Sequence, residues 1–147
     1  MGVRREGREA AVQFLYQRDL DPEADRGSYY AMRGISPSAR RFCDELLDGF
    51  VAVSERVDGL IRETAKNYEF ARISAVDRNI LRIAASELVA NNGTPPAVAI
   101  NEAIEIAKKY STAESGRFVN GVLDRIRQTL AKPAPPGAPA AKPDSAG

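Results

Sequence analysis

The sequence predicts an all-α fold, a compact bundle of about six or seven helices. Apolar residues recur at three- and four-residue spacing through successive segments, which is the period of an amphipathic helix. No segment alternates apolar and polar residues over the length of a strand with turn signals on both sides. The 147 residues, 44% of them hydrophobic, suffice to close one core without disulfides or metal ions, so we expect one domain.

The first helix is expected from about Arg8 to Leu20. Its apolar face is formed by Ala11, Val12, Leu15 and Tyr16. Asp21-Pro22 ends it, because the residue before a proline disfavours the α region. Over residues 23–35 the periodicity is weak and glycine recurs, so this stretch is either a loop or a short second helix.

A long helical region begins at Ser36, a residue suited to cap a helix, and Pro37, whose missing N–H is not needed at the first helical position. Its apolar stripe, which runs on toward about Asn67, consists of Phe42, Leu46, Phe50, Val53, Val57, Leu60 and Ile61. A helix of this length is unusual, and residues 49–54 are a plausible break. We expect one bend or two helices.

A broad apolar face starts at about Ser74, and its width predicts a central helix that is contacted from more than one side. The face is made by Val76, Ile80, Leu81, Ile83, Ala84 and Leu88. Residues 91–93, Asn-Asn-Gly, predict a left-handed end to this helix. The two prolines at 95–96 then predict an extended link into a helix that begins near Ala97.

Two amphipathic patterns follow, joined by a short polar turn. The first places on one face Ile100, Ala103, Ile104, Ala107 and Tyr110. The second places on one face Val119, Val122, Leu123, Ile126 and Leu130. Both faces are expected to be buried. Phe118 lies next to Arg117 and one position off the second stripe, so we expect its ring to be exposed.

After about Leu130 the composition changes to KPAPPGAPAAKPDSAG, which is rich in Pro and Ala and has no apolar periodicity. Such a segment cannot bury enough apolar surface to offset the entropy lost on ordering. We therefore expect a structured domain over residues 1–131 and a disordered tail over residues 132–147.

Composition excludes several classes of catalytic site. The chain has no histidine and one cysteine, so it lacks the base of a Ser or Cys nucleophile system and the usual ligands of zinc or an iron–sulfur cluster. No phosphate-binding glycine motif occurs. We expect no catalytic residue, no metal and no cofactor. Cys43 lies in a helical pattern next to Phe42, which predicts a buried structural thiol.

The net charge of +1 means that any nucleic-acid surface depends on local clusters of Arg and Lys, since the whole chain is nearly neutral. No apolar run is long enough to cross a membrane, and no signal-peptide pattern is present. We expect a cytoplasmic protein without membrane association.

Basic residues cluster at two places. Arg4, Arg5 and Arg8 lie at the amino terminus, where a mobile basic arm over residues 1–8 can follow phosphates and gain affinity by counterion release. Such a cluster is also typical of a solvated chain end.

The second place is the short polar turn between the two amphipathic patterns. There Arg117 and Phe118 follow residues 115–116, which we expect at the start of a helix. There, free backbone N–H groups can meet a phosphate while the ring stacks on an unpaired base. An aromatic residue near a helix start is also typical of a partly buried core position. Lys108 and Lys109 precede this turn, where lysines usually complement the helix dipole.

Four strings follow one another along the chain: REAAVQFLYQ, ISAVDRNILRIAASEL, AVAINEAIEIAKKYS and GRFVNGVLDRI. In their order and spacing they resemble the NusB family of bacterial transcription antitermination factors, over roughly Arg4 to Ile126. The resemblance implies two packed helical subbundles and a role in binding rather than catalysis.

In that family the RNA ligand is the boxA element of nascent ribosomal RNA transcripts, and the protein partner is NusE, a small-subunit ribosomal protein. The pair loads onto RNA polymerase with other Nus factors and suppresses premature termination, which supports transcription of ribosomal RNA operons. Some family members are homodimers, so a homodimer is one expected form of the free protein.

The resemblance also assigns residues to the RNA. Phe118 matches the family's RNA-contacting phenylalanine. The full set is Arg4, Arg5, Arg8, Arg117 and Phe118, with Lys108 and Lys109 in a supporting role. The amino-terminal arm is usually richer in arginine, and here Glu6 and Gly7 interrupt it, so we expect a shallow dependence of RNA affinity on salt.

For the protein partner, Tyr16 and Asp77 match positions at which the family docks NusE. Asp77 stands where the family often has Glu, which keeps the charge and shortens the reach. Arg78 and Arg82 lie near Asp77 at helical spacing, and they either form ion pairs within the helix or line the same interface.

Three alternative functions stay open at this point. A small all-α enzyme of the chorismate mutase type also needs no His, Cys or metal, but it requires buried Arg and Lys, which here fall mostly on polar faces. The NusB-like amino-terminal domain of ribosomal RNA cytosine methyltransferases needs a further catalytic domain, where this chain has a Pro/Ala tail. The third is a helical interaction module that has lost RNA binding.

Overall fold

A computed structural model describes residues 2–66 and 72–132, and in this part of the chain it contains six α-helices and no strand. The helices are α1 (Val3–Leu20), α2 (Arg26–Arg33), α3 (Pro37–Thr64), α4 (Ala75–Ala90), α5 (Pro96–Tyr110) and α6 (Ala113–Ala131). The all-α prediction is confirmed. The predicted tail, apart from Lys132, lies outside the described residues.

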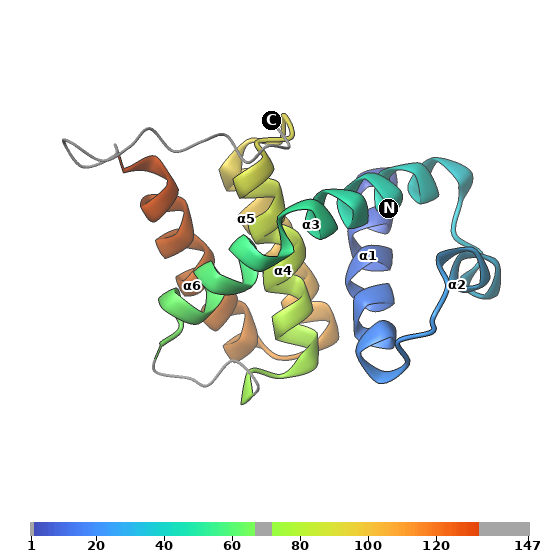
Figure 1. Cartoon of the computed structure of the whole chain (residues 1–147), viewed down its shortest axis with the longest axis horizontal. Helices are drawn as coiled ribbons and strands as arrows, with labels where there is room; N and C mark the ends of the chain where they lie inside the picture. Colours follow the sequence, from blue (N-terminus) through green and yellow to red (C-terminus); the bar gives the residue numbers. More distant parts are fainter. Residues whose placement is uncertain (1, 67–71, 133–147) are drawn as a thin grey trace.

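Helix α3 organises the molecule into two halves. It runs across the structure from α1 and α2 on one side to α6 on the other (Figure 1). Its first half packs with α1 and α2, and its second half packs with α4 and α6, on which α5 packs in turn, which gives the two subbundles that the family resemblance implies. One continuous apolar core passes through both halves, because buried residues of every helix belong to the same cluster.

Side-chain caps and prolines fix where the helices begin. Ser36, Ser74 and Thr112 each accept a hydrogen bond from the backbone N–H three residues later, at 3.0–3.3 Å. Ser36 is thus the cap that the sequence predicts. The predicted left-handed end of α4 is also confirmed, since Asn91 has φ of 50° and closes the helix with a backbone hydrogen bond to Glu87.

The first helix begins at Val3, five residues earlier than predicted, so the expected mobile arm is wrong for residues 3–8. The reason is a close approach of α1 to α3. A Cβ on Gly7 would lie 2.8 Å from Cδ2 of Phe42 and 3.2 Å from the carbonyl oxygen of Ala39. Only glycine permits this contact, which holds the first turns of α1 in helical conformation against the core.

The two uncertain regions of the sequence are resolved as helix. Within residues 23–35, α2 packs on α3 through the Tyr30 hydroxyl, which donates a hydrogen bond of 2.6 Å to Asp44. The long region is one helix with a bend, because Val53 departs from helical geometry with φ of −126° and ψ of 20°. This position lies within the break predicted at residues 49–54.

The predicted core stripes of α5 and α6 are buried except for Ile104 and Leu130, which are partly buried, and Tyr110. Tyr110 is the exception that corrects the prediction, since it is 40% exposed and its hydroxyl donates a 2.5 Å hydrogen bond to Glu9. Cys43 is fully buried as expected, and burial raises the pKa of its thiol to about 11. Among the described helices, none has the length and apolar character needed to span a bilayer.

Candidate nucleic-acid interface

Phe118 lies at a junction of three helices. Because Thr112 caps α6, residues 115–116 form part of its first turn and Phe118 lies in the second turn, further from the helix start than predicted. The ring is half-buried against the core, so the structure gives the partly buried position that the sequence left open, not the exposed ring. It borders two hollows on the surface, one toward α4 and one toward α3.

The hollow toward α4, here called the acidic hollow, has a volume of about 250 Å³. Its lining residues are Arg72, Ile73, Ser74, Asp77, Thr112, Glu114, Ser115 and Phe118. The amino-terminal ends of α4 and α6 both face it, so partial positive charge from two helix ends meets two carboxylates. The base of a nucleotide and a donor group of a protein partner are both chemically suited to this mixture.

Asp77 is the most buried carboxylate of the acidic hollow, at 8% exposure. Its backbone N–H donates to the Ser74 hydroxyl at 3.1 Å, while Oδ1 has no hydrogen-bond partner within the described part of the chain. Burial raises the pKa of this carboxyl, and the hydroxyls of Ser115 and Ser74 oppose the shift. A buried acceptor in this state favours the approach of an external hydrogen-bond donor.

The hollow toward α3, here called the basic hollow, has a volume of about 260 Å³. It lies between the end of α3 and the outer face of α6, and its lining residues are Thr64, Ala65, Arg117, Phe118, Gly121, Val122 and Arg125. None of these carries a carboxylate. Phe118 is therefore flanked by surfaces of opposite character.

The two lysines before the turn have different surroundings. Lys109 forms a 2.9 Å ion pair with Glu9 of α1, and this hydrogen bond raises the pKa of its ammonium group. Lys108 is half-exposed, with Glu105 at 3.6 Å. Its aliphatic stem lies over the first turn of α6, where a Cβ on Gly116 would be 3.1 Å from Lys108 Cγ. The two side chains are about equally exposed, at 52% and 50%, and Lys108 is the one with the longer ion pair.

The amino-terminal arginines are held in place by the fold. Arg8 is bound to Glu87 by two hydrogen bonds of 2.8 and 3.0 Å and its side chain is 4% exposed, so the expectation that it follows phosphates is corrected. Arg5 pairs with Glu102 at 2.9 Å. Arg4 lies over the Phe42 ring at 5.2 Å and is the one of the three whose residue is exposed.

Tyr16 lies at a separate groove, 39% exposed. This groove, the Tyr16 groove, has a volume of about 400 Å³ and is lined by Val12, Gln13, Tyr16, Gln17, Leu20, Arg33, Val76 and Tyr110. The lining is mostly apolar, and Leu20 at its edge is 73% exposed. Since Val76 lines this groove and Asp77 lines the acidic hollow, adjacent residues of α4 connect the two sites.

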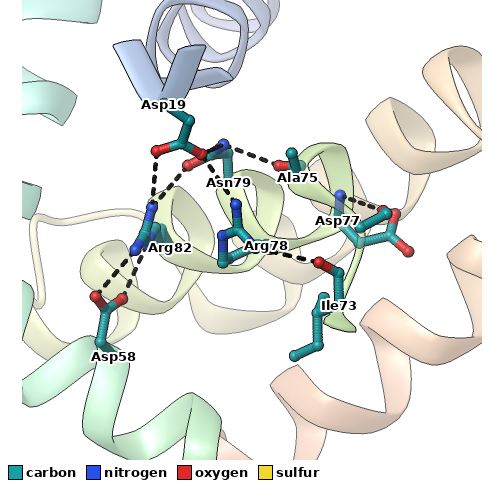
Figure 2. A network of polar contacts seen from close by, with 9 residues as sticks. Asp19, Asp58, Ile73, Ala75, Asp77, Arg78, Asn79 and Arg82 are labelled. Atoms are coloured by element: carbon teal, nitrogen blue, oxygen red, sulfur yellow. Dashed lines mark hydrogen bonds and ion pairs between the residues drawn. The ribbon is translucent and has the colours of Figure 1, made fainter. Parts of the chain in front are cut away.

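Arg78 and Arg82 form ion pairs between helices, so of the two alternatives left open the ion pairs within one helix are not the ones observed. Figure 2 shows both guanidinium groups beside Asp19 of α1, at 3.2 and 3.6 Å, with Arg82 also held by both oxygens of Asp58 from α3. Asp77 points away from this network. Both arginines are therefore occupied in joining α1, α3 and α4.

Comparison with known proteins places this geometry in a family. The sequence model of the NusB family matches residues 5–128, which is most of the chain. The chain belongs to the NusB family. It is 43% identical over 141 residues to the transcription antitermination protein NusB of Desulfotalea psychrophila, covering 90% of this chain and 100% of that protein. The NusB of Heliobacterium modesticaldum is also 43% identical, over 94% of this chain and 71% of that protein.

Solved NusB structures share the fold. The NusB of T. maritima superposes with a TM-score of 0.75 at 35% identity, over 85% of this chain and 90% of that chain. A crystal structure of the antitermination factors NusB and NusE in complex with double-stranded RNA matches with a TM-score of 0.78 at 28% identity, over 88% of this chain and 98% of that chain. In that structure a NusB chain is accompanied by both a protein partner and RNA.

One basic residue of this NusB-family chain was missed by the sequence reasoning. Arg125 lines the basic hollow together with Arg117, although the sequence prediction assigned it no role. The spacing offered a signal, because Arg117, Gly121 and Arg125 are four residues apart and so share one face of a helix. The other wall, from the end of α3, is more than 50 residues distant in the chain and left no such signal.

Proposed function

We propose that this protein is a transcription antitermination factor that binds the boxA element of nascent ribosomal RNA transcripts together with NusE. Its relatives carry the antitermination name, and a structural neighbour contains NusB, NusE and RNA. We place the function in residues 1–131, with RNA polymerase and other Nus factors completing the assembly. The free protein is a monomer or a homodimer in this proposal.

The observation that carries the RNA assignment is the position of Phe118 beside Arg117. A half-buried ring offers a base a fixed stacking surface, and the adjacent exposed guanidinium is placed to meet a phosphate. Stacking contributes about 1–3 kcal/mol per base. Lys108 and Arg4 add exposed charge, whereas Arg5 and Lys109 reach RNA only if they release their carboxylate partners.

We assign NusE to the Tyr16 groove and the adjoining Asp77. The groove combines exposed apolar side chains with a tyrosine, the composition typical of the centre of a protein interface. Oδ1 of Asp77, which has no hydrogen-bond partner among the described residues, accepts a hydrogen bond from NusE in this assignment. Arg78 and Arg82 support the surface indirectly, because they hold α4 against α1 and α3.

Fluorescence anisotropy tests the proposal. A boxA-like single-stranded RNA and a scrambled control are titrated with the protein alone and with its cognate NusE, at several salt concentrations. Preference for boxA that strengthens with NusE supports antitermination. Equal and weak binding of both RNAs, with or without NusE, contradicts it and leaves the helical interaction module.

A further inference from the structure

Most arginines in the described part of the chain already have an intramolecular partner. The exceptions, whose side chains have no hydrogen bond, ion pair or ring contact among the described residues, are Arg18, Arg117 and Arg125. Two of them, Arg117 and Arg125, line the same basic hollow. An unpaired guanidinium keeps its full capacity to bind an anion, since no internal carboxylate has to be displaced first.

The two arginines are arranged along a helix face. They are two turns apart on α6, which places their backbones about 12 Å apart along the helix axis. Gly121 lies between them on the same face, and a Cβ there would meet nothing within 4 Å. The surface between the arginines is therefore low and open, so an extended backbone can lie across α6 without a steric barrier.

The wall and floor of the basic hollow suit the same ligand. Phe118, Val122 and Ala65 give it an apolar floor on which a base or ribose can rest. Lys66 follows Ala65, is exposed and has no partner among the described residues. The acidic hollow on the other side of Phe118 contains Arg72 and two helix amino termini, but also the carboxylates of Asp77 and Glu114, which repel phosphates, whereas the basic hollow has no carboxylate in its lining. Charge therefore directs a polyanion from Phe118 toward α3.

We propose that the basic hollow is a second stretch of the RNA path, in which the strand whose base stacks on Phe118 continues along α6 and Arg125 binds a backbone phosphate. This inference rests on the proposed function and adds a direction to it. Arg117 and Arg125 then contact different phosphates along one strand, because the distance between the two arginines is too long for one guanidinium to span. RNA bases gain no sequence-specific contact from Arg125 in this arrangement.

Arg125→Gln in the full chain tests the proposal, with Arg127→Gln as the matched control. Arg127 lies on the same helix, is half-exposed and pairs with Asp124, so both variants lose one positive charge from α6. Affinity is measured for boxA RNA and for the same RNA extended by flanking nucleotides at either end, at several salt concentrations. Removing one phosphate contact lowers the slope of log K against log salt by about 0.7 for single-stranded RNA.

For Arg125→Gln we expect a several-fold loss of affinity and the shallower salt slope. Both effects should appear with the RNA extended at one end and not with the RNA extended at the other end. Arg127→Gln is expected to bind like the wild type. If both variants behave alike with every RNA, the path is wrong. Phe118→Ala is measured in the same experiment, and a loss of RNA affinity in this variant supports the proposed function even if the path along α6 is wrong. Absence of RNA binding by the wild type contradicts both the proposed function and the path.

A second pair of variants tests the basic hollow without removing an arginine. Gly121→Glu places a negative charge between Arg117 and Arg125, and Gly121→Gln adds a neutral side chain of the same size. Both fit the open space and favour helix over glycine, so both are expected to fold. We expect the Glu variant to weaken binding of the extended RNA several-fold more than the Gln variant. Equal binding by the two would exclude a strand at this position.

Discussion

Arg8 and Glu87 form a buried, two-bond ion pair between α1 and α4. Nε and Nη2 of the arginine donate to the two carboxylate oxygens at 3.0 and 2.8 Å, and the side chains are 4% and 2% exposed. Asn92 donates a further hydrogen bond to the same carboxylate at 3.3 Å. The pair fixes the first turns of α1 against the central helix, which explains why this basic segment is ordered.

Removing one member of the pair is therefore expected to destabilise the fold. Arg8→Met leaves Glu87 buried without its main partner, which costs about 3–5 kcal/mol in the free energy of unfolding. Urea denaturation measures the loss. The double variant Arg8→Met/Glu87→Met should regain most of it, because no uncompensated charge remains. A double variant no more stable than Arg8→Met alone would show that the ion pair itself, and not the isolated charge, sets the stability.

Phe118→Leu separates stacking from packing at the proposed RNA site. Leucine keeps most of the apolar bulk against the core but has no aromatic face, so the unfolding free energy should change by less than the RNA affinity. We expect RNA binding to weaken by about 1–3 kcal/mol. Anisotropy and urea denaturation on the same protein give both values. An unchanged RNA affinity would remove the ring from the binding site.

Tyr16→Ala is expected to weaken binding of NusE while RNA binding by the free protein stays the same. Tyr16 is 39% exposed beside an apolar groove, and tyrosines in such positions often contribute more than about 1 kcal/mol to an interface. Isothermal titration calorimetry with NusE measures the change. Met32→Ala is the control, since Met32 is 75% exposed but does not line the Tyr16 groove.

Asp77→Asn tests the pKa of the buried carboxyl. Burial raises this pKa in the folded state, so the folded protein holds the proton more tightly than the unfolded chain does. The ionised carboxylate therefore reduces stability at neutral pH, and this effect fades as the pH falls through the raised pKa toward the ordinary value of 3.8. We expect Asp77→Asn to be at least as stable as the wild type at neutral pH.

The measurement is the difference in unfolding free energy between wild type and Asp77→Asn across this pH range. The contributions of the other titrating groups are common to both proteins and cancel in this difference. The advantage of the Asn variant should shrink as the pH is lowered. A variant that is less stable at neutral pH, by an amount independent of pH, would mean that the carboxylate is stabilised by contacts stronger than its burial cost.

The helix boundaries that the sequence predicted well are those that depend on residues close together in the chain. Ser36 and Pro37 mark the start of α3, and Asn91 marks the end of α4, because caps and left-handed ends depend on residues within one turn. The start of α1 was missed because its first turns contain arginine, glutamate and glycine and show no apolar stripe. Their partners, Phe42, Glu87 and Glu102, are distant in the sequence.

The candidate site shows the same division. The family motif predicts a role for Arg117 and Phe118, since both lie in one contiguous string. The surroundings of Phe118 were not predictable from that string, because the end of α3 and the start of α4 approach it only in the folded chain. The burial and the partners of each arginine were equally unpredictable from the sequence. Arg8 and Arg125 are the same residue type, yet one is buried against Glu87 and the other is exposed, with no side-chain partner among the described residues.

The bent helix α3 has a consequence for how the protein fails. It contributes core residues to both halves of the molecule on either side of Val53, so neither half retains a closed core when the other melts. The chain is then a single cooperative unit. Under the proposed function, thermal or mutational unfolding therefore removes the proposed RNA surface and the proposed NusE surface together, and leaves no half-folded chain that binds NusE or a transcript alone.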